Sequence, residues 1–267
     1  MIPYSHQTIT RIDIDAVIRV LRSPWLTQGP VVKRFERAIA RYTGATYVVS
    51  FSSGTAALQA AYFAAGIGTG DEVITSPLTF CSTANAALWQ GARAVFADID
   101  PETGAIDPKE VEKKITKRTR AIVPIDYGGH PAKLDQLKKI ARKNNILLIE
   151  DAAHALGASC KGKRVGSIAD MTMFSFHPVK SITTGEGGAI ATNKKEFYER
   201  LILFRNHGIT KDPKKFVKKS EGGWYHEMQA LGLNYRLTDI QAALGESQMR
   251  RLAQFLKARR RIAERYS

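Results

Sequence analysis

Between residues 47 and 205 the sequence alternates short β-branched runs with segments of helical periodicity. The runs, which we predict to be strands, are Tyr47–Phe51, Glu72–Ser76, Arg93–Ala97, Arg120–Ile125, Ile146–Glu150, Met171–Phe176 and Gly188–Thr192. The helical segments lie near Thr55–Ala65, Ser82–Gln90, Lys109–Ile115, Leu134–Arg142 and Lys195–Arg205. Apolar strands that alternate with helices form a sheet covered on both faces. The pattern therefore predicts an α/β fold with a mostly parallel seven-stranded sheet between helices, and a ligand site beyond the carboxyl ends of its strands.

Helical spacing is also found on both sides of this alternation. Towards the N-terminus it covers Ile12–Leu21 and Val31–Tyr42, and Gly44 ends the second of these helices. Towards the C-terminus, Thr238 is a suitable N-cap, and the residues after it predict one long helix over Asp239–Arg265.

A loop with one lysine near its centre follows the predicted strand Met171–Phe176. It turns at Pro178, contains Lys180 and ends in a glycine-rich stretch at residues 185–188. A lysine in such a loop can form a Schiff base with a carbonyl substrate or a pyridoxal cofactor. The alternative is a solvated surface lysine, one of 40 lysines and arginines, and the loop alone does not decide between the two.

The turn that joins the first predicted strand to a helix carries small and hydroxylated residues. Gly54 permits close approach, and the hydroxyls of Ser53 and Thr55, together with the free amides of a helix start, suit a phosphate group. An ordinary strand-to-helix turn with a good N-cap fits this turn equally well.

Acidic and aromatic residues follow two further strands. Asp151 ends the most apolar strand, where a carboxylate can pair with a protonated pyridine nitrogen, and His154 would lie near the same ring. Phe80 follows the strand Glu72–Ser76 and could stack on a planar ring. Taken singly, these residues fit a capping acid, a hydrogen-bonded histidine and a core phenylalanine. Together with the lysine loop and the phosphate turn, they match the groups of pyridoxal 5′-phosphate.

The sequence resembles the sugar aminotransferases of the DegT/DnrJ/EryC1/StrS family, which are fold type I pyridoxal-phosphate enzymes. The segments that carry this resemblance are Leu26–Pro30, Ser53–Leu58, Glu150–Gly157, Phe174–Gly188 and Leu233–Ala243. Within the family, the chain is most similar to the enzymes of pseudaminic acid synthesis, which aminate C4 of a UDP-4-keto-6-deoxy-N-acetylhexosamine. That similarity is carried by Asp126–Gly129, His154–Gly157 and Arg205–Pro213.

The resemblance implies a role for each matched residue. Lys180 would hold the cofactor covalently and move a proton between cofactor and substrate, and Asp151 would hold the pyridinium nitrogen. His154 would lie near the ring oxygen, and Phe80 would stack on the ring. The phosphate would be bound by Ser53, Gly54, Thr55, Ser175 and, from the neighbouring subunit, Asn234. The positions that match substrate contacts are Tyr4, Trp25, Leu26, Thr27 and Arg236. No metal site is expected.

The resemblance also implies the reaction and its partners. L-glutamate would donate its amino group to the cofactor, and a nucleotide-linked keto sugar would then receive it. A homodimer with shared active sites follows from the role of Asn234. Family relatives that dehydrate their substrate carry histidine at the position of Lys180, so the lysine favours amination. Three alternatives stay open: a 3-keto substrate, a dTDP sugar, and a non-catalytic homologue that binds cofactor or sugar.

Three parts are expected along the chain. Residues 1–44 would form an N-terminal helical and loop segment that contacts the substrate and the partner subunit. Residues 45–235 would form the large cofactor-binding α/β domain, and residues 236–267 would begin a long helix. Family members continue for about a hundred residues into a smaller C-terminal domain, within the usual domain size. We expect that domain to be missing from this sequence.

The composition is that of an ordinary soluble globular protein, with 44% hydrophobic and 24% charged residues. The formal net charge of +15 favours anionic partners, nucleotide sugars among them. The basic residues are scattered and no aromatic residues interleave with them, so nucleic-acid binding is not expected. No signal core or bilayer-length apolar run is found, and the two cysteines cannot form a disulfide framework. A cytoplasmic protein without membrane contact is therefore predicted.

Overall fold

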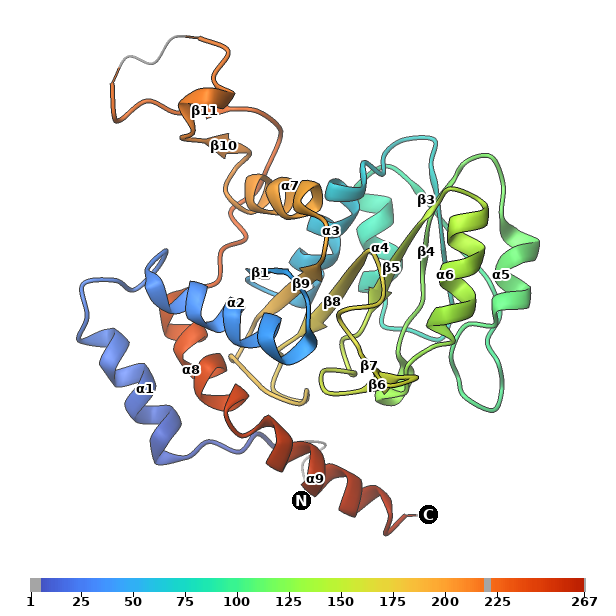
Figure 1. Ribbon diagram of the computed structural model, residues 1–267, viewed down its shortest axis with the longest axis horizontal. Coiled ribbons are helices and arrows are strands. Elements are labelled where there is room, and N and C mark those ends of the chain that lie inside the picture. Colours follow the sequence, from blue (N-terminus) through green and yellow to red (C-terminus); the bar gives the residue numbers. More distant parts are fainter. Residues whose placement is uncertain (1–5, 219–221, 267) are drawn as a thin grey trace.

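The computed structural model describes residues 6–218 and 222–266, and it shows an α/β fold (Figure 1). Its central sheet has seven strands in the order β1-β9-β8-β5-β4-β2-β3. Their bounds are Tyr47–Phe51 (β1), Glu72–Thr75 (β2), Arg93–Phe96 (β3), Thr119–Val123 (β4), Leu147–Asp151 (β5), Met171–Ser175 (β8) and Gly188–Thr192 (β9). Strand β9 is antiparallel to both of its neighbours, β1 and β8, and the other pairs in the sheet are parallel. The predicted mostly parallel seven-stranded sheet is confirmed.

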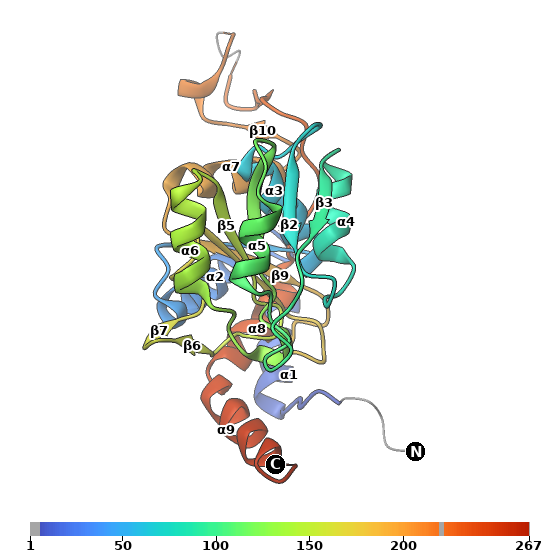
Figure 2. The ribbon, with the colours of Figure 1, turned by 90° about the vertical axis from the view of Figure 1, so that its right-hand side faces the viewer.

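Helices cover both faces of this sheet. One face packs against α3 (Gly54–Ala65), α4 (Ser82–Trp89) and α7 (Lys195–Arg205). The other face packs against α2 (Pro30–Thr43), α5 (Pro108–Lys114) and α6 (Leu134–Lys143). Figure 2 shows α4 and α6 on opposite sides of the sheet. The strands alternate their side chains between these two apolar layers, which explains why the central strands are mostly apolar.

Shorter elements lie outside these layers. Two-stranded ladders form between β6 (Ser159–Cys160) and β7 (Lys163–Arg164), and between β10 (Ile209–Thr210) and β11 (Glu227–Met228). Single 3₁₀ turns cover Tyr127–Gly129 (η1) and Pro213–Lys215 (η2). In both views the orange segment with β10 projects beyond the sheet, opposite the C-terminal helix α9 (Figures 1 and 2). In the described ranges, no helix has both the length and the apolar character that crossing a bilayer requires.

The long helix predicted over Asp239–Arg265 is divided in two, so that prediction is wrong. Helix α8 covers Asp239–Met249 and α9 covers Leu252–Ala263. Between them, Arg251 leaves the helical conformation with φ −110° and ψ 4°. Its guanidinium donates to the carboxylate of Asp13 in α1 (Arg11–Leu21). This contact with a side chain more than two hundred residues away has no signature in the local sequence, which reads as a continuous helix.

Asp13 is fully buried and joins α1 to α8 through a hydrogen-bond network. Its carboxylate accepts from Ser247 Oγ at 2.7 Å and from the amide of Thr10 at 2.9 Å, besides the guanidinium of Arg251. Burial raises the pKa of Asp13, but the hydrogen bonds from Ser247, Thr10 and Arg251 and the arginine's charge outweigh it and lower the pKa overall. The network therefore stabilises the fold above the ordinary pKa of aspartate and weakens as the pH falls through the lowered value.

Replacing Asp13 by alanine is expected to lower the free energy of unfolding by about 3–5 kcal/mol at neutral pH, because Arg251 would be left buried without its partner. The matched control is Asp15→Ala in the same helix. Asp15 pairs with Arg11 at 2.9 Å on the surface, where the arginine side chain is 82% exposed. That control should cost less than about 1 kcal/mol. Denaturant unfolding of both variants checks this, and equal losses would contradict a special role for Asp13.

Candidate active site

The carboxyl ends of β1 and β8 bring a turn and a hydroxyl together. A methyl group placed on Gly54 would lie 3.3 Å from Cβ of Ser175, the last residue of β8. A methyl group placed on Gly188 would lie only 2.5 Å from the carbonyl oxygen of Ser53. The turn after β1 therefore approaches β9 so closely that position 188 requires glycine, and it leaves little room for a side chain at position 54. Ser53, Gly54 and Ser175 are assembled at one edge of the sheet.

The N-terminus of α3 lies in this turn. The first amides of a helix have no intrahelical acceptor, and their dipoles favour an anion. Ser53 caps the helix, since its hydroxyl accepts from the amide of Ala56 at 3.0 Å. The amides of Gly54 and Thr55, with the hydroxyls of Thr55 and Ser175, form a donor set that suits a phosphate.

Asp151 ends β5 and is 4% exposed. Its Oδ2 accepts from Thr83 Oγ1 at 2.7 Å and its Oδ1 accepts from the amide of Ala153 at 3.2 Å. Burial raises the pKa of Asp151, while these two hydrogen bonds and the charge of Lys180 oppose the rise. Behind it, Tyr62 donates to the carbonyl of Thr83 at 2.9 Å. The carboxylate is thus held in place from two sides, ready to accept from a cationic N–H group.

Lys180 lies half-buried in the loop between β8 and β9. Its backbone amide donates to the carbonyl of His177 at 2.9 Å, and its own carbonyl accepts from Arg259 of α9 at 2.7 Å. Burial lowers the pKa of Lys180, and the negative charge of Asp151 partly opposes this. Burial, followed by the charge of Lys180, lowers the pKa of His154. The three side chains therefore lie within electrostatic reach of one another, as the sequence predicts.

A cavity of about 550 Å³ borders the lysine loop. Lys180 and Ser181 line one wall, and Phe255 and Arg259 of α9 line the other. The guanidinium of Arg259 also donates to the carbonyl of Val179 at 3.3 Å, so α9 supports the backbone that carries the lysine.

Phe80 lies next to Asp151 through its backbone. Its carbonyl is 3.3 Å from the hydroxyl of Thr83, which itself donates to Asp151. Phe80 is 75% exposed, so its ring is free to cover a planar ring at this edge. The sequence alone did not identify Thr83 as a residue of the site. Its one signal is its place three residues after Phe80, on a helix that starts beyond the carboxyl end of β2.

None of the described residues that we predict to touch the sugar lines the cavity beside Lys180. Trp25 and Leu26 are exposed, and Thr27 forms a bridge with Thr238. Arg236 lines a second cavity, of about 410 Å³, between α2, β1 and α7. Tyr4 lies outside the described residues. The substrate roles of these residues stay predictions.

Asn234 is exposed and pairs with Asn206 through an isolated bridge. The next residue, Tyr235, accepts from the amide of Ser52 at 2.9 Å, so the segment that carries Asn234 runs past the phosphate turn of its own chain. Its role in the phosphate site of a neighbouring subunit stays a prediction.

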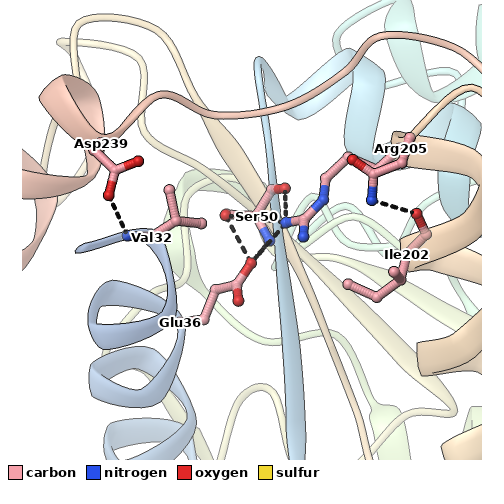
Figure 3. Close-up of polar contacts among 7 residues, drawn as sticks. Val32, Glu36, Ser50, Ile202, Arg205 and Asp239 are labelled. Carbon is pink, nitrogen blue, oxygen red and sulfur yellow. Dashed lines mark hydrogen bonds and ion pairs between the residues drawn. The ribbon is translucent and has the colours of Figure 1, made fainter. Parts of the chain in front are cut away.

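Two buried acids, Glu36 and Asp239, which the sequence did not single out, connect α2 to distant segments of the chain (Figure 3). Glu36 of α2 accepts from Ser50 Oγ at 2.8 Å and from Arg205 of α7 at 2.7 Å. Asp239 accepts from the amides of Gly29 and Val31 at 2.7 and 2.8 Å and so caps α2. The two segments Leu26–Pro30 and Leu233–Ala243, which resemble the family, are therefore joined to each other in space.

Pyridoxal 5′-phosphate carries one group for each part of the site. Its phosphate matches the amides and hydroxyls at the start of α3, and its pyridinium N–H matches the carboxylate of Asp151. Its aldehyde matches the amine of Lys180, whose lowered pKa makes it a better nucleophile. The donor set fits the cofactor, and with the order of the sheet it defines the class of fold type I pyridoxal-phosphate enzymes.

The chain belongs to the DegT/DnrJ/EryC1/StrS aminotransferase family, which it matches over residues 7–267. It is 45% identical over 269 residues to the UDP-4-amino-4,6-dideoxy-N-acetyl-beta-L-altrosamine transaminase of Campylobacter jejuni, covering 100% of this chain and 69% of the relative. The family is one of pyridoxal-phosphate-dependent sugar aminotransferases, so the predicted class of enzyme and its cofactor are confirmed.

The similar solved structures include two aminotransferases. One is Helicobacter pylori PseC, an aminotransferase involved in the biosynthesis of pseudoaminic acid, with a TM-score of 0.86 and 37% identity over 94% of this chain and 66% of that one. The other is the PLP form of the putative sugar aminotransferase Spr1654 from Streptococcus pneumoniae, with a TM-score of 0.91 and 33% identity. The match covers 99% of this chain and 70% of that one. The chain thus spans about two thirds of the length of the relatives it matches.

Proposed function

We propose that this protein transfers an amino group from L-glutamate to C4 of a UDP-linked 4-keto-6-deoxy-N-acetylhexosamine. The observation that carries the proposal is the placement of Lys180, Asp151 and the start of α3 around one edge of the sheet. The transaminase of Campylobacter jejuni and PseC support the choice of sugar by their similarity. The product of such a reaction is an amino sugar for a surface polysaccharide or glycan.

In this proposal the bound cofactor supplies an electron sink that stabilises negative charge at the substrate carbon. Lys180 would move a proton between that carbon and the cofactor. Because its pKa is lowered by burial, more of its amine is neutral at physiological pH than in a free lysine. Asp151 keeps a negative charge opposite the pyridinium position. Thr83 and Ala153 fix one oxygen of that carboxylate each, so its orientation is set before any ligand binds.

The proposal extends to a second subunit and to the sugar. Asn234 completes the phosphate site of a partner chain, which makes the active unit a homodimer. Trp25, Leu26, Thr27 and Arg236 contact the nucleotide sugar, and the exposure of the first three leaves them accessible for such a contact.

Incubation of the purified protein with pyridoxal phosphate, glutamate and a panel of keto nucleotide sugars tests the proposal. Glutamate alone should abolish the visible absorbance of the bound cofactor, and a UDP-4-keto sugar should restore it with formation of an amino sugar detected by mass. Turnover of only a 3-keto or a dTDP sugar would overturn the choice of substrate. Bound cofactor that never responds to glutamate would instead support a non-catalytic binding protein.

A further inference from the structure

Two further carboxyl groups, those of Asp126 and Glu150, lie behind Asp151. Glu150 precedes Asp151 in β5, so its side chain points to the opposite face of the sheet. There it lies beside Asp126, which follows β4, and both residues are 0% exposed. Asp126 Oδ1 accepts from the amide of Ala132 at 3.0 Å, and Glu150 Oε2 accepts from Thr172 Oγ1 at 2.7 Å. One oxygen of each carboxyl group is therefore satisfied.

The other oxygen of each group, Asp126 Oδ2 and Glu150 Oε1, is buried without a donor. The two side chains lie within hydrogen-bonding reach of each other. Among the residues that the structure describes, no group of three or more histidine, cysteine or acidic side chains is arranged to hold a metal ion. Two ionised carboxylates offer only acceptors and repel, whereas a single proton between them satisfies both oxygens.

We propose that Asp126 and Glu150 share one proton, and that this acid pair is a positioning device for the cofactor edge of the sheet. The inference deepens the proposed function, because it assigns a role to residues behind Asp151. The amide of Asp126 donates to the carbonyl of Asp151 at 3.0 Å, so the pair holds the backbone of that acid. The bond from Ala132 to Asp126 closes the turn that starts at Tyr127.

That turn borders the site through Gly129. A methyl group placed on Gly129, whose φ is +88°, would lie 2.9 Å from the carbonyl oxygen of His154. Movement of Asp126 would therefore shift the turn against the backbone of His154, next to the predicted cofactor ring.

The surroundings of the pair favour the protonated form. Burial, and then the charge of Glu150, raises the pKa of Asp126 well above its ordinary range. Burial also raises the pKa of Glu150, although the hydroxyl of Thr172, the carboxyl group of Asp126 and the nearby amide of Gly166 oppose the rise. The other titratable groups that face the pair are Asp151 from β5 and the thiol of Cys160 from β6, and both become negative when they ionise.

Proton linkage to unfolding tests the proposal. Unfolded Asp and Glu side chains have pKa values near 4, so the unfolded chain releases the proton that the folded pair keeps. Stability should therefore fall as the pH rises, and the unfolding constant should increase about tenfold per pH unit for this one proton. In Asp126→Asn the new amide donates to Glu150 while Oδ1 still accepts from Ala132. In that variant the unfolding constant should no longer show this tenfold increase per pH unit. Asp151 is present in both proteins, so its own titration does not cause the difference.

The measurement is denaturant unfolding of the cofactor-free protein at several pH values between about 5 and 8, the range in which the unfolded carboxyl groups are ionised. Since no cofactor is present, the result does not depend on the proposed reaction. Glu150→Gln, which can donate to Asp126 Oδ2, should give the same loss and replaces the first variant should that one not fold. Equal pH dependence in the wild type and in the amide variants would mean that no proton is shared, and would overturn the proposal.

The positioning role has its own readout, the dissociation constant of pyridoxal phosphate. Asp126→Asn keeps every hydrogen bond of the pair and should bind the cofactor as tightly as the wild type does. Asp126→Ala loses the bond to Ala132 and leaves Glu150 Oε1 without a partner, so binding should weaken about tenfold, the effect of one hydrogen bond. Wild-type affinity in Asp126→Ala would show that the pair does not position the site.

Discussion

Replacing Lys180 by alanine should abolish covalent attachment of the cofactor and lower the rate of transamination by roughly 10²- to 10⁴-fold, the usual contribution of a positioned proton-transfer group. Lys180→Arg should be equally inactive, because a guanidinium keeps its proton at all accessible pH values. The arginine variant retains the positive charge near Asp151 and His154. It therefore separates loss of the amine from loss of charge.

The absorption spectrum and borohydride treatment check this expectation. With pyridoxal phosphate, the wild type should show a visible band that borohydride removes, leaving the cofactor mass on the peptide that contains Lys180. The matched control is Lys163→Ala in the exposed β7, which should behave as the wild type does. A Lys180 variant that keeps both the covalent cofactor and the rate would refute the assignment.

The pH profile supplies a second check on Lys180. Only the neutral amine accepts a proton, so activity should rise as the pH passes through its pKa. Burial lowers that pKa, and the rising limb should therefore fall below the value of about 10.4 for a free lysine. If the rising limb of the activity profile gave a pKa at or above that of a free lysine, Lys180 would be solvated in the working enzyme.

The positions of Ser53, Asp151 and Lys180 could be predicted because each lies at the carboxyl end of a strand or in the loop that follows it. Strands with apolar side chains on both faces form a parallel sheet, and parallel strands end at one edge. These residues lie at the carboxyl ends of three strands, β1, β5 and β8, and the structure brings them to one region. Local sequence was sufficient here, since the topology repeats the same strand-to-loop geometry each time.

Contacts between distant segments could not be predicted in this way. Thr83 reaches Asp151 across 68 positions of sequence, and Arg251 reaches Asp13 across 238. Neither pair has a periodicity or a spacing of its own, and the contact with Asp13 divides a helix that the sequence shows as continuous. The partner of a buried charge is set by tertiary packing, so the residues that tune Asp151 emerge only from the structure.

Replacing Asp151 by asparagine should leave the cofactor bound to Lys180 while the rate falls by roughly 10²- to 10³-fold, the loss seen when one electrostatic stabiliser is removed. The neutral amide cannot hold a proton on the pyridine nitrogen, so the cofactor is a weaker electron sink. Burial makes the ionised Asp151 costly in the cofactor-free protein, as its raised pKa indicates. The asparagine variant should therefore unfold at no lower denaturant concentration than the wild type, and its defect should be confined to turnover.

Thr83→Val gives the graded form of the same test. The hydroxyl of Thr83 donates to Asp151 at 2.7 Å and opposes the rise of its pKa. Without that bond the pKa of Asp151 should rise further, so that a smaller fraction is ionised at a given acidic pH. The acidic limb of the activity profile should then move to higher pH, while the rate at its plateau changes less than in Asp151→Asn. An acidic limb that stays in place would mean that the ionisation of Asp151 does not govern turnover.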